Sequence, residues 1–376
     1  MITSITLENF KCFASEQKFK LNKVNVFTGY NGRGKSTVFQ SFLLMAQSVY
    51  DNKSLKDLLV NGMFCNLGLF EDLVNHSSDA SDITFCFTTD GEKNKELLFT
   101  YKELSDRKGT LANLVVDGKG FLETAAQLGG EMQSTEKSLQ SYPEDIHSVF
   151  DNICFVSADR LGPTPFEVKR DLYENNPIGN SGEFRLNVLA EHREAKDEVA
   201  EAISKIMDGG VMSVKGDSDN EKSNDVLNLY FSSLMDGTPV KAINCGFGYS
   251  YIIPILLAAV SMNGGCLFVE NPEAHLHPCA QSQLIKTLVS MCGRNRIQLF
   301  IETHSEHVIN ALRLCSLEKE YADFAYADLA MYFFDKDMTV KSLQLGDDGQ
   351  VSEWPLGFFD QAERDAARII QLGLMK

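Results

Sequence analysis

The sequence predicts an α/β protein with a mostly parallel sheet, an antiparallel β subdomain beside it and a helical insertion. Apolar runs at residues 24–28, 153–157 and 266–270 have the length and composition of buried parallel strands. Each run leads into a glycine-rich or polar loop. Alternating segments from Ile83 to about Val116, broken by turn residues, indicate antiparallel strands instead.

A phosphate-binding loop is predicted at residues 29–37, which fit the pattern G-x-x-x-x-G-K-[ST] at every fixed position. A strand precedes the loop, and apolar residues at helical spacing follow it to Tyr50. We expect Lys35 to reach the β- and γ-phosphates of ATP and Ser36 to ligate Mg²⁺. The alternative is a glycine-rich turn that binds nothing. The predicted ATP-binding residues of this loop are Asn31, Gly32, Arg33, Gly34, Lys35, Ser36 and Thr37.

The segment upstream of the loop begins with a predicted strand from Ile2 to Leu7, followed by Asn9-Phe10-Lys11. Lys11 is a candidate contact for the base and ribose of the nucleotide. The alternative is an edge hairpin that packs against its own core, and the sequence leaves both open.

Further elements follow from residue patterns. Residues 55–75 are expected to be helical and then irregular, and residues 122–142 partly helical. Residues 165–240 have the composition of an insertion, with a charged amphipathic helix from about Asn187 to Met207 and a polar spacer after it.

Two strands in the second half of the chain lead into polar residues. The run at residues 266–270 ends in Glu270, where a nucleotide-hydrolysing fold holds Mg²⁺ through water. The run from Ile297 repeats this design, with His304 just beyond the strand. Upstream, Gly246, Gly248 and Ser250 form a second glycine-rich loop before an apolar helix, which predicts another anion-binding helix start.

Composition limits the classes of protein. The chain has 376 residues, 44% hydrophobic and 23% charged, as is typical of a soluble globular protein with two domains or one large one. Its net charge of -17 argues against a protein that coats nucleic acid, although a local basic groove or a basic partner stays open.

Targeting and redox features favour a cytoplasmic location. The nine cysteines include no C-x-x-C pair and mostly lie in apolar runs, which is typical of reduced thiols. Glu8 precedes any long apolar stretch, so we expect no signal peptide. The run at residues 252–260 contains Pro254 and is too short to span a bilayer, so no membrane association is expected.

These motifs, in this order, resemble the ATP-binding-cassette (ABC) type of ATPase, and more narrowly the soluble prokaryotic branch related to the RecF, SMC and OLD-nuclease ATPases. The tail at residues 354–360 resembles the C-terminal module of ATPases in anti-phage defence operons, Septu-type subunits among them. The resemblance implies an ABC-ATPase head. Its expected parts are an N-terminal lobe at 1–165, an insertion at 166–240, a C-terminal lobe at 241–350 and a tail module at 351–376.

The resemblance also implies a head-to-head homodimer with two ATP molecules at its interface. Lys35 and Ser36 of one subunit would hold the triphosphate. Gly246, Gly248 and Ser250 of the other subunit would close on the γ-phosphate. ATP would then hold the dimer together, and hydrolysis would release it.

One residue departs from the family pattern. The acid motif of the family usually has two adjacent acids before proline, whereas Glu270 here is followed by Asn271 and Pro272. Glu270 takes the Mg²⁺ position, and the amide of Asn271, in the place of the base, cannot accept a proton at neutral pH. Either Glu273 or His304 substitutes, or turnover is slow; we predict slow hydrolysis.

The resemblance implies an ATP-binding, slowly hydrolysing ATPase that regulates or drives a separate effector, a nuclease in bacterial anti-phage defence. No nuclease motif is found in the chain, so cutting would need such a partner. The alternatives are a RecF-like DNA-repair clamp, a transporter ATPase subunit and a pseudo-ATPase scaffold. A dedicated metal site is also considered, because His275-x-His277 and His304-x-x-His307 have ligand spacings.

Overall fold

The computed structural model describes residues 1–90, 95–120, 145–172, 177–216, 226–232, 237–321, 323–355, 358 and 360–374. Its central sheet has the strand order β17-β16-β3-β15-β14-β9. The strands of this sheet are β3 (Val24–Gly29), β9 (Ile153–Val156), β14 (Cys266–Glu270), β15 (Gln298–Glu302), β16 (Leu329–Phe334) and β17 (Val340–Leu343). Neighbouring strands pair in parallel, except that β17 runs antiparallel to β16. The predicted mostly parallel sheet is confirmed.

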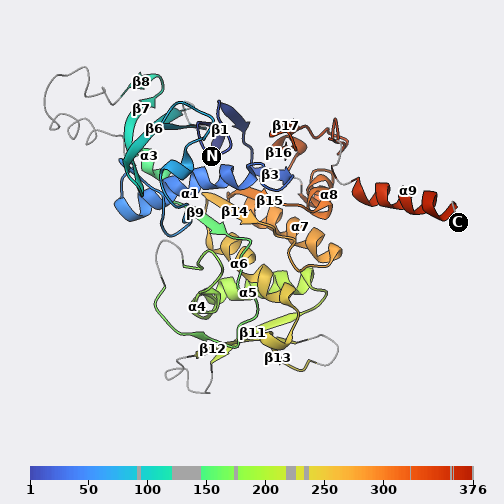
Figure 1. Ribbon diagram of the computed structural model, residues 1–376. Coiled ribbons are helices and arrows are strands. Elements are labelled where there is room, and N and C mark those ends of the chain that lie inside the picture. The colour runs from blue at the N-terminus through green and yellow to red at the C-terminus, as the bar shows by residue number, and fades with distance from the viewer. Residues whose placement is uncertain are drawn as a thin grey trace, which may run out of the picture.

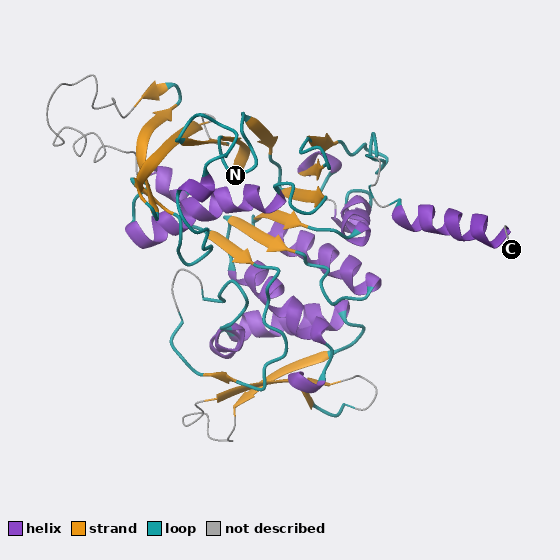
Figure 2. Cartoon of the chain, viewed as in Figure 1, coloured by secondary structure: helices purple, strands orange, loops and turns teal. Residues whose placement is uncertain are grey.

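Helices cover both faces of the central sheet, which explains why its parallel strands are mostly apolar (Figure 1, Figure 2). The covering helices are α1 (Lys35–Asn52) on one face, and α6 (Phe247–Ser261) and α7 (Pro278–Arg294) on the other. Successive strand residues point to opposite faces. The α6 and α7 side receives aliphatic residues, and the α1 side receives aromatic ones, namely Phe27, Phe268 and Phe300.

An antiparallel sheet packs over α1, with the order β2-β1-β5-β6-β7-β4 and β8 paired to β7. Its strands are β1 (Ile2–Glu8), β2 (Gln17–Lys20), β4 (Asp57–Leu59), β5 (Ile83–Thr89), β6 (Lys95–Ser105), β7 (Lys108–Val116) and β8 (Lys119–Gly120). The two layers meet at Phe42 of α1, whose ring lies 5.3 Å from Phe87 and 5.1 Å from Phe268. The predicted antiparallel subdomain is confirmed.

The prediction of a helix after residue 55 is wrong. Residues 57–59 form the edge strand β4, and a 3-10 turn, η1, spans Glu71–Leu73. The buried side chain of Gln47 donates to the carbonyl oxygen of Leu59 at 2.6 Å and accepts from the amide of Cys65 at 3.1 Å. Contacts with α1 and β7, which are distant in sequence, therefore decide this backbone.

The insertion contains helices and a small sheet below the central one in Figure 1. Its elements are β10 (Glu167–Val168), α4 (Arg185–Glu191), α5 (Arg193–Ile206), β11 (Val211–Gly216), β12 (Val226–Ser232) and β13 (Val240–Lys241). The helix predicted over 187–207 is two helices, because His192 has φ -111° and ψ 89°. The small sheet was not predicted, since its outer strands β10 and β13 have only two residues each.

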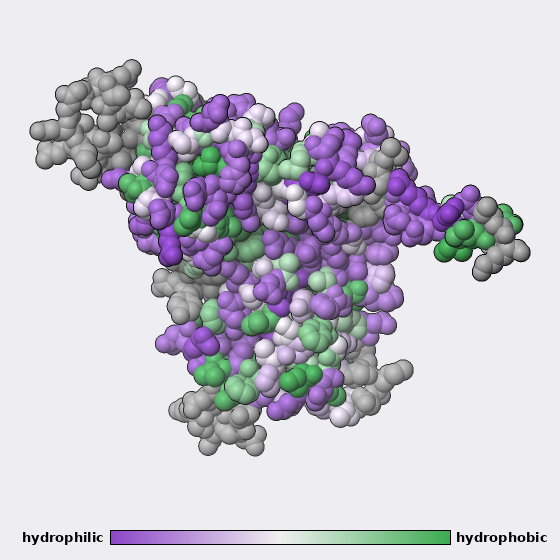
Figure 3. All heavy atoms as spheres, in the orientation of Figure 1, coloured by the Kyte–Doolittle hydropathy of each residue, from purple (hydrophilic) through white to green (hydrophobic). Residues whose placement is uncertain are grey.

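The remaining helices are α3 (Asp145–Ser148), α8 (Glu306–Cys315) and α9 (Gln361–Leu374), with 3-10 turns η3 (Ala242–Asn244), η4 (Lys319–Tyr321) and η5 (Tyr326–Asp328). Helix α9 projects from the body in Figure 1, and Figure 3 shows apolar residues near its end; Ile369 and Leu374 are 70% and 84% exposed. The helix expected at 122–142 lies outside the described residues. Within the described part of the chain, no helix is long and apolar enough to cross a bilayer.

Candidate nucleotide-binding site

The loop between β3 and α1 has the backbone that its glycines require. Gly29, Gly32 and Gly34 have φ values of 120°, 69° and 103°, a region that side chains disfavour. A Cβ atom at Gly29 would lie 2.3 Å from the carbonyl oxygen of Phe334 in β16. Helix α1 starts directly after Gly34 with no side-chain cap, so its first amides are available to an anion.

Lys35 is the buried cation at the end of this loop. Its side chain is buried, and Nζ donates to the carbonyl oxygens of Gly29 at 3.2 Å and Tyr30 at 2.8 Å. Burial lowers the pKa of Lys35, and the carboxylate of Glu302 opposes this change. The ammonium group is thus held against the loop where phosphate charge is expected.

Glu302, the last residue of β15, is a site residue that the sequence analysis missed. β15 lies between β3 and β14, and the parallel register places Glu302 beside Glu270. The Glu302 carboxylate accepts a hydrogen bond from the Ser36 hydroxyl at 2.8 Å. Burial raises the pKa of Glu302 to about 7. The sequence signal that could have identified Glu302 is that β15 ends in an acid, as β14 does at Glu270.

Glu270 lies at the same edge but points toward β9. One oxygen of its carboxylate accepts from the amide of Ala158 at 3.0 Å, and burial raises the pKa of Glu270. The structure therefore places Glu302, and not Glu270, in direct contact with Ser36. The predicted magnesium role of Ser36 and Glu270, in which Glu270 acts through water, stays a prediction.

The residues after Glu270 form a turn, residues 271–276, which we call the acid turn. Asn271 has a left-handed backbone, with φ 43°, and its amide donates to the carbonyl oxygen of Glu302 at 2.7 Å. Glu273 accepts from the amide of His304 at 2.8 Å, while its second carboxylate oxygen is buried without a hydrogen-bond partner among the described residues. Burial lowers the pKa of His304, and Lys35 adds to this effect. The fold thus brings together the three predicted catalytic residues, Glu270, Glu273 and His304.

Lys11 lies beside the first turns of α1. Its Nζ donates to the side-chain oxygen of Gln40 at 2.7 Å, and a Cβ atom at Gly34 would lie 2.5 Å from Sγ of Cys12. This segment thus packs against the phosphate loop. The contact of Lys11 with a nucleotide base stays a prediction.

The second glycine-rich loop is only partly accessible. Gly246 caps α6 and is exposed, and a Cβ atom added to it would meet open space out to 4 Å. At Gly248, a Cβ atom would lie 2.9 Å from the carbonyl oxygen of His275. Ser250 is fully buried, and its hydroxyl has no hydrogen-bond partner among the described residues. This enclosed position does not fit the predicted contact between Ser250 and a second subunit, whereas Gly246 remains available.

The oxygen donors at the sheet edge suit Mg²⁺. A hydroxyl and carboxylates are the ligands that this hard cation prefers. Glu270 is one of the groups that raise the pKa of Glu302, so the two carboxylates repel each other, and a divalent cation would relieve this repulsion. Ser36 and Glu302 would hold such an ion, with Glu270 beside them, and it would supply charge neutralisation for the phosphates.

The histidine pairs do not form a metal centre in the described part of the chain, where no group of three or more His, Cys, Asp or Glu residues has ligand geometry. His277 instead caps α7, because its Nδ1 accepts from the amide of Cys279 at 3.3 Å. The ring of His275 packs edge-on against Tyr251, with centroids 4.5 Å apart.

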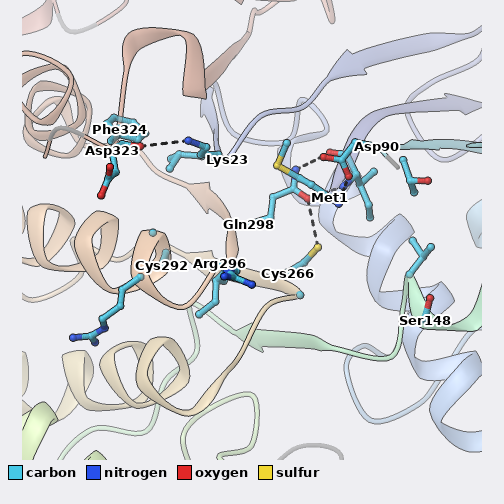
Figure 4. Close-up of a pocket in the computed structure, with 18 of the residues that line it drawn as sticks. Met1, Lys23, Asp90, Ser148, Cys266, Cys292, Arg296, Gln298, Asp323 and Phe324 are labelled. Carbon is cyan, nitrogen blue, oxygen red and sulfur yellow. Dashed lines mark hydrogen bonds and ion pairs between the residues drawn. The ribbon is translucent and has the colours of Figure 1, made fainter. Parts of the chain in front are cut away.

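A separate groove of about 1500 Å³ opens at the opposite edge of the central sheet (Figure 4). The amino ends of β3, β14 and β15 line it, and Figure 4 shows Lys23 directed at Asp323 and Cys266 at Gln298. Ligands of open α/β sheets bind outside the carboxyl ends of the strands. This groove is therefore distinct from the candidate nucleotide site.

Comparisons with known proteins identify similar ATPases. Residues 132–309 match the family model of an AAA ATPase domain, and residues 325–369 match one described as "Protein of unknown function (DUF3696)". An "ATP/GTP phosphatase" of Helicobacter pylori is 21% identical over 357 residues, covering 86% of this chain and 90% of the relative.

Solved structures with similar folds include an SMC head bound to the C-terminal winged-helix domain of ScpA, with a TM-score of 0.52, 11% identity and coverage of 92% of this chain and 98% of that one. The SMC head domain of Thermotoga maritima has a TM-score of 0.47 with 12% identity, covering 92% of this chain and 99% of that one. The similarity to the ScpA-bound SMC head shows that the chain has the fold of an ABC-type ATPase head.

Proposed function

We propose that this chain binds ATP with Mg²⁺, hydrolyses it slowly, and uses an ATP-dependent dimer to control a separate effector. The observation that carries the proposal is the contact between Ser36 of the phosphate loop and Glu302 of the neighbouring strand, with Lys35 on the same loop. This contact supports the proposal, because it joins the hydroxyl expected to ligate Mg²⁺ to a carboxylate at the end of the neighbouring strand. The match to an AAA ATPase domain supports this assignment.

Slow hydrolysis is proposed because the acid turn lacks a second acid next to Glu270. Asn271 carries an amide, and its side-chain oxygen is buried without a partner among the described residues. Glu273 is the nearest acid that follows in sequence. One of its carboxylate oxygens accepts from the amide of His304, and the other has no hydrogen-bond partner in the part of the chain that the structure describes. We propose that Glu273 orients the attacking water and does so less effectively than an acid at position 271.

Dimerisation around ATP is proposed from the exposed start of α6. Gly246 precedes the first turn of the helix and has no side chain to cap it, and the neighbouring side chain of Phe247 is 53% exposed. An uncapped helix start and an exposed aromatic ring are suited to contact a phosphate and an apolar neighbour, respectively. The role in trans therefore falls on Gly246 and the first backbone amides of α6.

The proposed effector is a nuclease, and the proposed setting is anti-phage defence. Support comes from the resemblance of the tail at residues 354–360 to the C-terminal module of ATPases in defence operons. The SMC head of similar fold is described as bound to a partner protein, ScpA. By analogy, a separate polypeptide would deliver the output of the ATP cycle.

Two measurements test the ATPase part of the proposal. Binding of a fluorescent ATP analogue and steady-state phosphate release are compared for the wild type, Lys35→Ala and the control Lys18→Ala, which removes an exposed lysine of β2. Lys35→Ala is expected to abolish binding, because the triphosphate loses its main fixed cation. Equal binding by all three proteins would refute the assigned site, and fast turnover by the chain alone would contradict slow hydrolysis.

The dimer and the effector are tested separately. Light scattering is expected to give a dimer mass with a non-hydrolysable ATP analogue and a monomer mass without it. Gly246→Glu should block the dimer by placing a negative charge at the proposed phosphate contact, while retaining ATP binding. A monomer mass under all conditions would refute the dimer. Nuclease activity that is independent of ATP in a reconstituted complex with the neighbouring gene product would refute effector control.

A further inference from the structure

Arg160 is a buried cation between β9 and the acid turn. Its side chain is 2% exposed, although it follows β9 in a loop. One terminal nitrogen donates to the carbonyl oxygens of Ser157 at 2.9 Å and Glu270 at 2.7 Å, and the other to that of Asn271 at 2.6 Å. The planar guanidinium thus bridges two segments that are more than a hundred residues apart in sequence.

The hydrogen bonds of Arg160 lie next to a residue with an unfavourable backbone conformation. Asn271 has a left-handed backbone, a conformation that costs free energy in residues other than glycine. Arg160 donates to the carbonyl oxygen of Asn271 and to that of the preceding residue, Glu270, so it holds the backbone on both sides of the Asn271 Cα atom. The acid turn then delivers Glu273 to the amide of His304.

Arg160 also contacts the helix that starts at the second glycine-rich loop. The guanidinium carbon lies 5.3 Å from the ring centroid of Tyr251 in α6. The same ring packs edge-on against His275 of the acid turn. Tyr251 therefore contacts both Arg160 and His275 of the acid turn.

We infer that Arg160 is a positioning residue of the ATPase site, which fixes the acid turn and ties it to α6 through Tyr251. It acts through the carbonyl oxygens of Glu270 and Asn271 and does not itself hold the phosphates. The inference rests on the proposed function insofar as it predicts an effect on turnover. Its structural half, the support of the acid turn, is independent of ATP.

Arg160→Lys separates geometry from charge. Lysine keeps the positive charge but is a point donor on a flexible stem, so it cannot reproduce the fork that reaches three carbonyl oxygens. The turnover number is expected to fall by about 10- to 100-fold, the effect of misplacing a catalytic group by about 1 Å. The KM for ATP is expected to stay near the wild-type value, because the phosphate loop is unchanged. Wild-type turnover in Arg160→Lys would overturn the inference.

Arg185→Lys is the matched control. Arg185 is also buried, at 1% exposure, and also donates to backbone carbonyl oxygens. Its carbonyl acceptors lie in residues 161, 162 and 182, and its other polar contacts are Thr164 and Glu167, all outside the acid turn. A general loss of stability would affect both variants, so rates are normalised to the folded fraction from thermal unfolding. Equal normalised losses in the two variants would refute a specific role of Arg160.

Hydrogen exchange without nucleotide tests the structural half directly. The amides of Asn271, Ala274 and Leu276 are hydrogen-bonded in the native turn. In Arg160→Lys, exchange of a peptide that covers residues 271–276 is expected to accelerate by about tenfold, since the hydrogen bonds that hold the turn are lost. In Arg185→Lys it should change little. Unchanged exchange in Arg160→Lys would overturn the inference even if the wild type proved to have no ATPase activity.

Tyr251 provides a second route if Arg160→Lys does not fold. Tyr251→Leu removes the ring that packs on Arg160 and His275 but keeps a good helix-forming residue. It is expected to accelerate exchange in the acid turn and to lower turnover, whereas Tyr251→Phe, which keeps the ring, should resemble the wild type. If Tyr251→Leu changes neither quantity, the proposed tie between α6 and the acid turn is wrong.

Discussion

Glu302→Gln is expected to stabilise the nucleotide-free protein while weakening the proposed magnesium site. Glu302 is 8% exposed, and burial raises the pKa of its carboxyl group from 4.5 to about 7. The charged groups that act on it are Glu270, Lys35 and Glu273, of which the two acids raise the pKa and the lysine lowers it. Glutamine keeps an oxygen that can accept from Ser36 but carries no charge.

The sign and size of the effect follow from proton linkage. The folded protein binds the Glu302 proton more tightly than the unfolded chain, so the free energy of unfolding falls as the pH rises from about 4.5 to about 7. The difference between the two pKa values corresponds to about 3 kcal/mol. Glutamine does not ionise, so Glu302→Gln avoids this loss of stability. The free energy of unfolding of the variant should exceed that of the wild type by about 3 kcal/mol at pH 8 and by almost nothing at pH 4.5.

Thermal unfolding at several pH values measures this difference. At about 2 cal/mol/K per residue, the entropy of unfolding makes the gain at pH 8 equivalent to a rise of about 4 °C in Tm. Mg²⁺ should raise the Tm of the wild type at pH 8 but have little effect on Glu302→Gln. Glu306→Gln, an exposed acid four residues along, is the control and should show neither change. A Tm difference for Glu302→Gln that does not depend on pH would refute the buried-carboxylate reasoning.

Three further substitutions test the packing around the site. Gly29→Ala should lower the Tm sharply and reduce ATP binding, because its Cβ atom would lie 2.3 Å from the carbonyl oxygen of Phe334 at a φ of 120°. Phe42→Ala removes a fully buried ring between the two large sheets and should cost about 3–5 kcal/mol in urea unfolding. Gln47→Leu leaves the carbonyl oxygen of Leu59 without its donor and should cost about 1–3 kcal/mol, with increased hydrogen exchange near residue 59.

Gly246→Ala is the control for the glycine substitution, since the position has a negative φ and open space for a methyl group. It should leave the Tm unchanged. A Gly29→Ala protein with wild-type Tm would mean that β3 and β16 separate easily. A change of less than about 1 kcal/mol in Phe42→Ala or Gln47→Leu would show that the contacts around α1 relax without cost.

The phosphate loop and the strands around it were predictable because each depends on local signals. Gly29 and Gly34 are required by the backbone of the loop itself, and Lys35 begins the helix that follows. The apolar runs that became β3, β9 and β14 have no polar face, which identifies strands covered on both sides. The edge strand β4 was missed because it is held by β7 and by Gln47, which its own sequence does not reveal.

The site was only partly predictable for the same reason. Glu270, Glu273 and His304 were expected from motif positions, and the fold brings them to one edge. Glu302 was overlooked because its contact with Ser36 depends on the strand order. The role of Ser250 was predicted from a pattern that says nothing about burial, and the structure encloses its side chain.

By itself, the sequence determined that this chain has a phosphate loop, strands buried on both faces and acids at strand ends, since these depend on residues close together along the chain. Only the tertiary structure decided which acid meets Ser36, which glycine stays exposed and where the Arg160 guanidinium is placed. Those outcomes depend on the order in which strands distant in sequence pair, and on the surface that remains uncovered afterwards. Pairing order sets distances between side chains that no local pattern encodes.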